Sequence, residues 1–327
     1  MNVIAVIGAG GIGFRHTQAL LNIALDTALY VVDISDDALA RVRDYAAHAE
    51  QNPHIKELHA LHDLSELPDT VDLAVIATTS GIRRKLTERL LHEKKVRFLL
   101  LEKVLFPRLE DYDAVGALLK ETGTAAYVDC CRRAYPSYQA LRRQILTEGK
   151  AHFTLTGSNW GLACNAIHEI DLFAYLTGAD CKSFRCDGTL LDNTLLESKR
   201  GGYLEFSGIL SGSFDRGSFF IQCDQRDTES ASTILQIRTD RSCYLVDEGR
   251  GIIEVSPLSG GAPAQRPFAC LYVSQITNHA AEEMLTQGRT ELASFEDSAA
   301  LHRAMLKAFL DKQAEITGEE SDTCSIT

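Results

Sequence analysis

A glycine-rich turn at residues 8–13, Gly-Ala-Gly-Gly-Ile-Gly, constrains the fold of this chain more than any other feature. An apolar run at residues 3–7 leads into the turn, and a helix-like stretch from about residue 12 to 25 follows it. A second apolar run ends at Asp33, about 20 residues beyond the last glycine, where dinucleotide-binding turns place an acid. The order of strand, glycine turn, helix, strand and acid predicts a doubly wound α/β unit with a dinucleotide site.

Each position of the turn has a physical role. Gly8 permits the tight turn, Gly10 lets the backbone approach a pyrophosphate, and Gly13 lets the helix pack closely on the strand. Free N–H groups at the helix N-terminus favour phosphate. The Asp33 carboxylate can accept ribose hydrogen bonds and would repel a 2′-phosphate, so NAD is favoured over NADP. A glycine turn without a ligand is the alternative. The predicted cofactor contacts here are Gly8, Gly10, Gly11, Ile12, Gly13 and Asp33.

The same alternation of strands and helices continues to about residue 129. Strands are expected at 71–77, 96–101 and 125–129, and helices at 36–49, from the 78–81 turn to about 93, and at 109–121. This alternation predicts a parallel sheet, whose ligands bind at the carboxyl ends of the strands. Four residues at such ends are predicted to line the cofactor site: Thr78, Thr79, Glu102 and Lys103.

From about residue 202 the pattern changes to short strands separated by turns. Strands are expected at 203–210, 213–223, 232–238, 242–247 and 251–255, and they predict an antiparallel sheet with one buried face. A Pro- and Gly-rich stretch at 256–267 is expected to be a loop. Helices at 277–287 and 295–316 complete the prediction, followed by a tail of seven residues, for which docking on the domain is the alternative.

Composition excludes several functional classes. The 33 Lys and Arg against 45 Asp and Glu give a net charge of −12, which argues against a broad nucleic-acid surface. No apolar run reaches the ~18–20 residues of a membrane helix, and no signal peptide is expected at the N-terminus. Nine scattered cysteines without a C-x-x-C pair indicate reduced thiols and a cytoplasmic protein. A polar stretch with His54, His59 and His62 is expected to be a solvated loop rather than a metal site.

Five further segments make the chain resemble the Gfo/Idh/MocA family of NAD(P)-dependent oxidoreductases over nearly its whole length. They occur in the family's order after the glycine turn: Ala77–Thr79, Leu101–Lys103, Arg132–Pro136, His168–Asp171 and Ser294–Ser298. The resemblance implies an NAD-binding Rossmann domain at residues 1–125. It also implies a C-terminal α+β domain at residues 126–327, with a large, mostly antiparallel sheet for substrate binding and oligomerisation. A homodimer or homotetramer through that sheet is expected.

The resemblance makes Lys103 the catalytic lysine beside nicotinamide and substrate. Its ammonium could hydrogen-bond the reacting oxygen and stabilise the negative charge that develops there. A surface lysine paired with Glu102 is the alternative. Family members usually carry proline after this lysine, whereas this chain has Val104.

The resemblance also makes His168 a catalytic group that moves the hydroxyl proton. A helix is expected from near Cys164 to Gly178, so Cys164 and His168 share one face. The family commonly has an acid where this chain has Cys164, with Asn165 next to it. Lys103 and His168 could suffice with Asn165 orienting the substrate, or the reaction could involve an amine or imine. A zinc site and a core histidine are further alternatives.

Two more residues are candidates for substrate binding. Trp160, the only tryptophan, could line a sugar or belong to the core. Arg133 could hold an anionic substrate or form an ion pair between domains. The leading hypothesis is an NAD-dependent dehydrogenase or reductase of a sugar or sugar derivative, possibly phosphorylated or nucleotide-linked. The alternatives are an imine reductase or amine dehydrogenase, and an NAD-binding sensor or scaffold without turnover.

Overall fold

The computed structural model describes residues 1–227 and 232–327, which divide into two compact units. The first unit comprises Met1–Phe106, Glu110–Cys131 and Leu271–Phe295. The second comprises Pro107–Leu109, Arg132–Cys270 and Glu296–Thr327. The expected division into domains at residues 1–125 and 126–327 stays a prediction.

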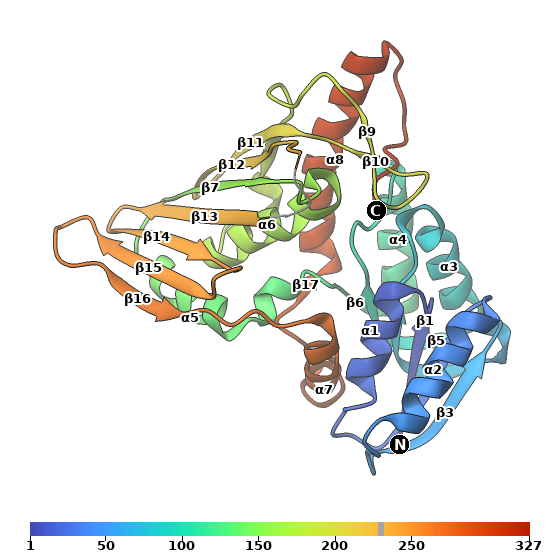
Figure 1. Ribbon diagram of the computed structural model, residues 1–327. Helices are drawn as coiled ribbons and strands as arrows, with labels where there is room; N and C mark the ends of the chain where they lie inside the picture. The colour runs from blue at the N-terminus through green and yellow to red at the C-terminus, as the bar shows by residue number, and fades with distance from the viewer. Residues whose placement is uncertain (228–231) are drawn as a thin grey trace. The chain divides into compact units, whose positions relative to one another are not determined.

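The first unit is built on a seven-stranded sheet in the order β17-β6-β5-β4-β1-β2-β3 (Figure 1). Its six parallel strands are β1 (Asn2–Ile7), β2 (Thr27–Val32), β3 (Ile55–Leu61), β4 (Thr70–Ile76), β5 (Lys95–Leu101) and β6 (Ala125–Val128). The short β17 (Ala293–Ser294) adds antiparallel to β6. Because β1 pairs with β2 on one side and β4 on the other, the strand order reverses beside the glycine turn, where doubly wound sheets bind their ligands.

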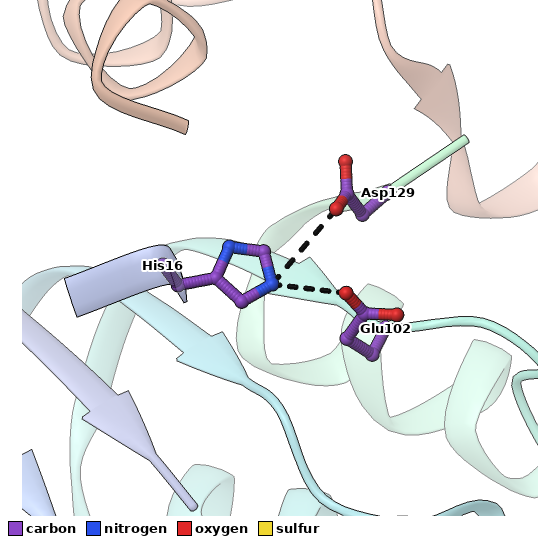
Figure 2. A group of neighbouring side chains, drawn as sticks. All are labelled: His16, Glu102 and Asp129. Atoms are coloured by element: carbon purple, nitrogen blue, oxygen red, sulfur yellow. Dashed lines mark hydrogen bonds and ion pairs between the residues drawn. The ribbon is translucent and has the colours of Figure 1, made fainter. Parts of the chain in front are cut away.

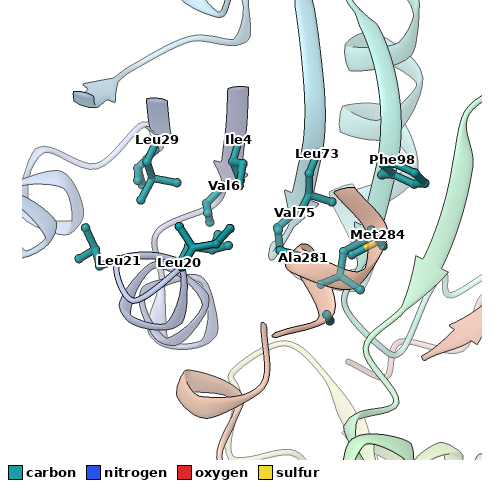
Figure 3. Close-up of a cluster of buried hydrophobic side chains, with 14 of the residues drawn as sticks. Ile4, Val6, Leu20, Leu21, Leu29, Leu73, Val75, Phe98, Ala281 and Met284 are labelled. Carbon is teal, nitrogen blue, oxygen red and sulfur yellow. The ribbon is translucent and has the colours of Figure 1, made fainter. Parts of the chain in front are cut away.

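Helices cover this sheet and share its apolar core. They are α1 (Gly11–Leu20), α2 (Asp36–His48), α3 (Ser80–Glu93), α4 (Leu109–Thr122) and α7 (Thr277–Gln287), with short 3₁₀ turns at Leu64–Glu66 and Val273–Gln275. Figure 3 shows Leu20 of α1 beside Ile4 and Val6 of β1, and Met284 of α7 in the same cluster. The late helix α7 therefore belongs to the hydrophobic core of the first unit.

The second unit is built on an eight-stranded sheet in the order β16-β15-β14-β13-β7-β12-β11-β8. The strands are β7 (Ala151–Ser158), β8 (Arg185–Asp187), β11 (Gly208–Phe214), β12 (Gly217–Cys223), β13 (Ser232–Thr239), β14 (Ser242–Asp247), β15 (Ile252–Pro257) and β16 (Ala264–Pro267). Neighbours pair antiparallel except β7 with β12. The predicted fold class, a Rossmann sheet followed by a large, mostly antiparallel sheet, is confirmed.

Helices and short turns complete the second unit. They are α5 (Pro136–Ile145), α6 (Leu162–Thr177) and α8 (Phe295–Thr317), 3₁₀ turns at Cys131–Ala134 and Cys181–Ser183, and a small hairpin of β9 (Leu196–Glu197) and β10 (Leu204–Glu205). Phe173 of α6 stacks on Phe153 of β7 with ring centroids 4.2 Å apart and also contacts Phe219 of β12. These aromatic contacts fix the axis of α6 against the central strands. Among the described residues, no helix has the length and apolar character needed to cross a membrane.

Several predicted details were wrong. Residues Ile55–Leu61 of the histidine stretch form strand β3, where His59 stacks on Tyr30 of the neighbouring strand at 4.7 Å, and His54 and His62 flank this strand. The 256–267 loop begins within β15 and ends in β16. The turn between β11 and β12 lies at residues 215–216 rather than 211–212. The last residues form the docked alternative of the expected tail, because Cys324 and Ile326 are fully buried and the N–H of Cys324 donates to the carbonyl of Pro107.

Candidate functional site

The glycine turn leaves an open, uncapped helix N-terminus at the end of β1. Gly8 has a φ of +94°, and a Cβ on Gly13 would lie 1.8 Å from the carbonyl oxygen of Gly8. A Cβ on Gly10 or Gly11 would instead meet nothing within 4 Å among the described residues. Gly10 is the N-cap of α1 and offers no side-chain cap. The turn is therefore closely packed at Gly8 and Gly13 and open at Gly10 and Gly11. Free space next to the N–H groups of a helix N-terminus suits the phosphates of a dinucleotide.

Asp33 lies beside this turn. Its Oδ2 accepts the N–H of Ala9 at 2.5 Å and its Oδ1 accepts the N–H of Ser35 at 2.8 Å. A carboxylate at the end of β2 is thus held against the turn, as a ribose-binding acid requires. Sequence reasoning missed Arg41, whose Nη2 donates to the carbonyl of Ala9 at 2.7 Å and whose guanidinium lies 4.8 Å from the ring centroid of Phe14. The NAD preference stays a prediction.

The segment after β4 contains the two predicted threonines and an unpredicted arginine. The Oγ1 of Thr78 is buried and has no hydrogen-bond partner among the described residues, and Thr79 is the N-cap of α3. Arg83 of α3 is buried and donates to the carbonyls of Thr78, Val104 and Leu105. Arg83 therefore ties the segments that follow β4 and β5 together. No local sequence pattern identifies this role.

Glu102 and Lys103 follow β5, and Glu102 is not a surface partner for the lysine. Its side chain is buried and accepts a hydrogen bond from Nε2 of His16 at 3.0 Å, while its Oε2 accepts the backbone N–H of Lys103 at 3.1 Å. Burial favours the neutral acid, but the hydrogen bond from His16 and the positive charges of His16, Lys103 and Arg83 hold the pKa of Glu102 below its ordinary value. Lys103 is half-buried, and its peptide bond to Val104 is cis.

The metal hypothesis for the three histidines gains no support from their contacts. His54, His59 and His62 pair separately with Asp26, Glu57 and Asp36. Within residues 1–227 and 232–327, the group of three potential ligands that comes together is His16, Glu102 and Asp129.

In the second unit, the predicted residues gather around the start of α6. Gly161, with a φ of +76°, is the N-cap, and Asn165 donates to the carbonyl of Trp160 at 2.7 Å. The thiol of Cys164 donates to the carbonyl of Gly161 at 3.5 Å. His168 lies one turn further along the same helix and is half-buried. The indole N–H of Trp160 donates to the carbonyl of Gln222 at 3.0 Å, so the ring is anchored to β12.

Sequence reasoning missed a carboxylate at the same end of α6. Glu205 of β10 accepts the backbone N–H of Ala163 and, at 3.0 Å, that of Phe206. Burial raises the pKa of Glu205, although hydrogen bonds from these N–H groups and from the Cys164 thiol act in the opposite direction. An acid on strand β10 therefore contacts Cys164 of helix α6. Glu205 lies more than 30 residues beyond the start of α6 in the sequence, so the spacing of residues within the helix could not reveal it.

Arg133 forms an ion pair within the second unit rather than between domains. Its Nε and Nη2 lie 2.7 and 2.6 Å from the two carboxylate oxygens of Asp171, which is fully buried. Arg133 also lies 5.4 Å from the ring centroid of Tyr175. This bidentate contact fixes the guanidinium to α6, and its substrate role stays a prediction.

Comparison with known proteins agrees with this fold. The family described as "Oxidoreductase family, NAD-binding Rossmann fold" (Gfo/Idh/MocA) matches residues 3–130. Scyllo-inositol 2-dehydrogenase (NAD(+)) from Bacillus subtilis (strain 168) is 24% identical over 230 residues, which is 64% of this chain and 65% of that protein. The matched region thus spans slightly less than two thirds of the curated relative.

Two solved structures share the fold over nearly the whole chain. UDP-N-acetylglucosamine 3-dehydrogenase from Acidithiobacillus ferrooxidans has a TM-score of 0.67 and 15% identity, covering 94% of this chain and 96% of its own. The super-repressor mutant of Gal80p from Saccharomyces cerevisiae has a TM-score of 0.74 and 11% identity, covering 96% of both chains. With the glycine turn, Asp33 and the strand order on one sheet, residues 3–130 form an NAD(P)-binding Rossmann domain of the Gfo/Idh/MocA oxidoreductase family.

Proposed function

We propose that this protein is an NAD-dependent dehydrogenase or reductase that transfers a hydride between nicotinamide and a carbon of a sugar or sugar derivative. The observation that carries the proposal is Lys103, which follows buried Glu102 at the carboxyl end of β5 in a dinucleotide-binding unit. When bound, nicotinamide would accept or donate the hydride at its C4. The glycine turn and Asp33 would hold the dinucleotide, and the charge of Asp33 favours NAD over its phosphorylated form.

Two side chains have roles at the reacting oxygen. The ammonium of Lys103 would hydrogen-bond that oxygen and stabilise the charge that develops on it. His168 would take the hydroxyl proton in oxidation and return it in reduction, because an imidazole titrates near neutral pH. Asn165 and Trp160, whose polar groups are fixed by backbone contacts at 2.7 and 3.0 Å, would orient the substrate together with Cys164 and Arg133.

The substrate class rests on chemistry and on the names of relatives. One relative is named for an inositol and a structural neighbour for a nucleotide-linked amino sugar, and both substrates carry ring hydroxyls. Free, phosphorylated and nucleotide-linked sugars are therefore the compounds to screen. The charge of Lys103 would favour an anionic derivative over a neutral sugar, whereas the charge of Arg133 is already paired with Asp171.

The test is a screen for NAD reduction followed by one substitution and its control. Lys103→Ala should lower turnover by about 10²–10⁴-fold, with the NAD dissociation constant changed by less than about threefold. Lys120→Ala removes an exposed lysine of α4 in the same unit and should leave both quantities unchanged. Retained turnover in Lys103→Ala would exclude Lys103 as the catalytic group.

A second candidate function is an NAD-binding regulator without turnover. Cys164 favours it, because a thiol occupies the position where the family commonly has an acid. This candidate predicts NAD binding, no turnover of any screened sugar, and a gain of turnover in Cys164→Asp. Product analysis with the hydroxyl and amino forms of one sugar would separate alcohol chemistry from imine or amine chemistry.

We also propose a homodimer or homotetramer formed through the sheet of the second unit. Phe220 of β12 and Leu245 of β14 are 48% and 37% exposed, although both belong to the eight-stranded sheet. Paired sheets would remove these side chains from water. Sedimentation of Phe220→Asp against the unsubstituted protein tests this, because a charge in the contact should give a smaller species.

A further inference from the structure

Three ionisable side chains meet at the carboxyl edge of the first unit's sheet, and none of the three residues is exposed by more than 5% (Figure 2). His16 comes from α1, Glu102 follows β5 and Asp129 follows β6. Nε2 of His16 lies 3.0 Å from Oε1 of Glu102 and 3.8 Å from Oδ2 of Asp129. Figure 2 shows one edge of the imidazole facing both carboxyl groups.

Both ring nitrogens of His16 have polar neighbours, since Nδ1 lies 2.8 Å from Oγ1 of Thr277 on α7. Burial lowers the pKa of His16, but the hydrogen bond to Glu102 and the negative charges of Asp129 and Glu102 outweigh it, so the net shift is upward. Burial and the charge of Glu102 raise the pKa of Asp129 to about 7. A buried imidazolium with one ionised partner and one partner that titrates near neutrality fits these shifts.

This cluster is connected to Lys103 in two ways. Oε2 of Glu102 accepts the backbone N–H of Lys103 at 3.1 Å, so the acid fixes the backbone of the residue after it. The positive charges of Lys103 and Arg83 act on Glu102, and that of Lys103 also acts on Asp129. The groups that face the cluster are therefore Lys103 after β5, Arg83 of α3 and the Thr277 hydroxyl of α7.

We infer that His16, Glu102 and Asp129 are positioning residues for Lys103. The imidazolium of His16 holds the two carboxyl groups together, and Glu102 in turn fixes the backbone and the charge environment of the lysine. This inference rests on the proposed function, in which Lys103 is the catalytic lysine. Asp129 adds a pH-dependent charge to the same group of side chains.

A metal ion is the competing occupant, because the three potential ligand atoms lie within 4.8 Å of one another. Two features favour the proton instead. The 3.0 Å separation between His16 and Glu102 is that of a hydrogen bond. Lys103 and Arg83 already place two positive charges near the carboxylates, which reduces the attraction for a divalent cation.

The first experiment needs no substrate. Full-length protein labelled with ¹⁵N-histidine, with and without NAD, is titrated by NMR, and His16→Gln identifies the His16 signals. Two protonated ring nitrogens are expected at pH 7, with loss of one proton in Glu102→Gln and a lower titration midpoint in Asp129→Asn. Asp111→Asn, which changes a buried carboxylate paired with Arg84 in the same unit, should leave His16 unchanged. A neutral His16 at pH 7, unchanged His16 titration in both network variants, or a stoichiometric metal ion in the purified protein overturns the inference.

The second experiment uses any substrate found in the screen. Glu102→Gln should lower kcat by about 10²-fold, as misplacement of a reacting group does, with the NAD dissociation constant within about threefold. Asp129→Asn should remove an inflection near pH 7 from the kcat profile, which loss of structure alone would not do. If the NMR result holds and no sugar is turned over, only the proposed function fails. If turnover depends on Lys103 but not on Glu102 or Asp129, only the positioning network fails.

Discussion

Two alanine substitutions in the glycine turn should separate cofactor binding from folding. At Gly13, a Cβ would lie 1.8 Å from the Gly8 carbonyl oxygen, 2.8 Å from its carbonyl carbon and 3.2 Å from Cβ of Ala77. Non-bonded contacts prefer about 3.5–4.0 Å, so α1 would have to move away from β1 by more than an ångström. We expect a loss of about 3 kcal/mol, the upper range for overpacking, even after the roughly 1 kcal/mol gained from helix propensity.

At Gly10 the expected result is the opposite. Its φ of −60° and ψ of −162° suit alanine, and the new Cβ would meet no described atom within 4 Å. Alanine is a poorer N-cap than glycine, which should destabilise the protein by about 0.5–1 kcal/mol. It also lowers the entropy of the unfolded chain, which should stabilise the protein by about the same amount, so stability should hardly change. The NAD dissociation constant should rise at least about tenfold, or about 1.4 kcal/mol, because the Cβ occupies the space for the pyrophosphate.

Thermal unfolding and calorimetric NAD titration measure both effects. Gly13→Ala should lower Tm by about 6–12 °C, whereas Gly10→Ala should bind NAD weakly and unfold like the unsubstituted protein. Gly116→Ala is the matched control, because it adds a methyl to a helix of the same unit at an ordinary 3.4 Å from Phe295. Unchanged NAD affinity in Gly10→Ala would refute the placement of the pyrophosphate at Gly10, and normal stability in Gly13→Ala would refute the close packing of Gly13 on Gly8.

Asp33→Asn should improve NADP affinity relative to NAD about tenfold, as a charge near the 2′-phosphate is removed; an unchanged ratio in binding titrations would contradict this. Arg133→Gln leaves Asp171 buried without its partner and should lower the unfolding free energy by about 3–5 kcal/mol in urea, while a paired Arg133→Met, Asp171→Leu variant recovers most of it. Burial raises the pKa of Glu169 from 4.5 to about 7, so its contribution to stability is present below pH 4.5 and lost as pH rises through 7. The loss should be about 3 kcal/mol, and Glu169→Gln should flatten that slope in urea unfolding.

The first unit could be predicted well because its signals are local. The turn at residues 8–13, the acid at the end of β2 and the apolar runs of β4 and β5 each occupy a few consecutive residues. The parallel order then follows from alternation of strands and helices. Sequence could not place α7 and β17 in this unit, because their contacts join residues more than 160 positions apart, such as Val128 with Ala293.

The site was predicted less completely, and the missing residues share one property. His16, Arg83, Asp129 and Glu205 act through contacts with residues far away in the chain. A histidine on an apolar helix or an acid in a two-residue strand has no spacing that distinguishes it from a core or surface residue. The end of a predicted strand placed Lys103 at the cofactor site, but the catalytic roles of Lys103 and His168 were predicted only because short segments around them resemble a family. In both units the structure therefore adds the side chains that support a predicted residue.

Glu205 changes how the substitution at Cys164 is interpreted. An acid missing from α6 would favour the regulator without turnover only if the start of that helix lacked a carboxylate. Glu205 accepts the N–H of Ala163 there and interacts with the Cys164 thiol, and burial raises its pKa above the ordinary value. An aspartate at residue 164 would bring a second negative charge against Glu205, and like charges at such a distance repel. Cys164→Asp should therefore lose turnover rather than gain it, because Glu205 of β10 already places a carboxylate at this end of the helix.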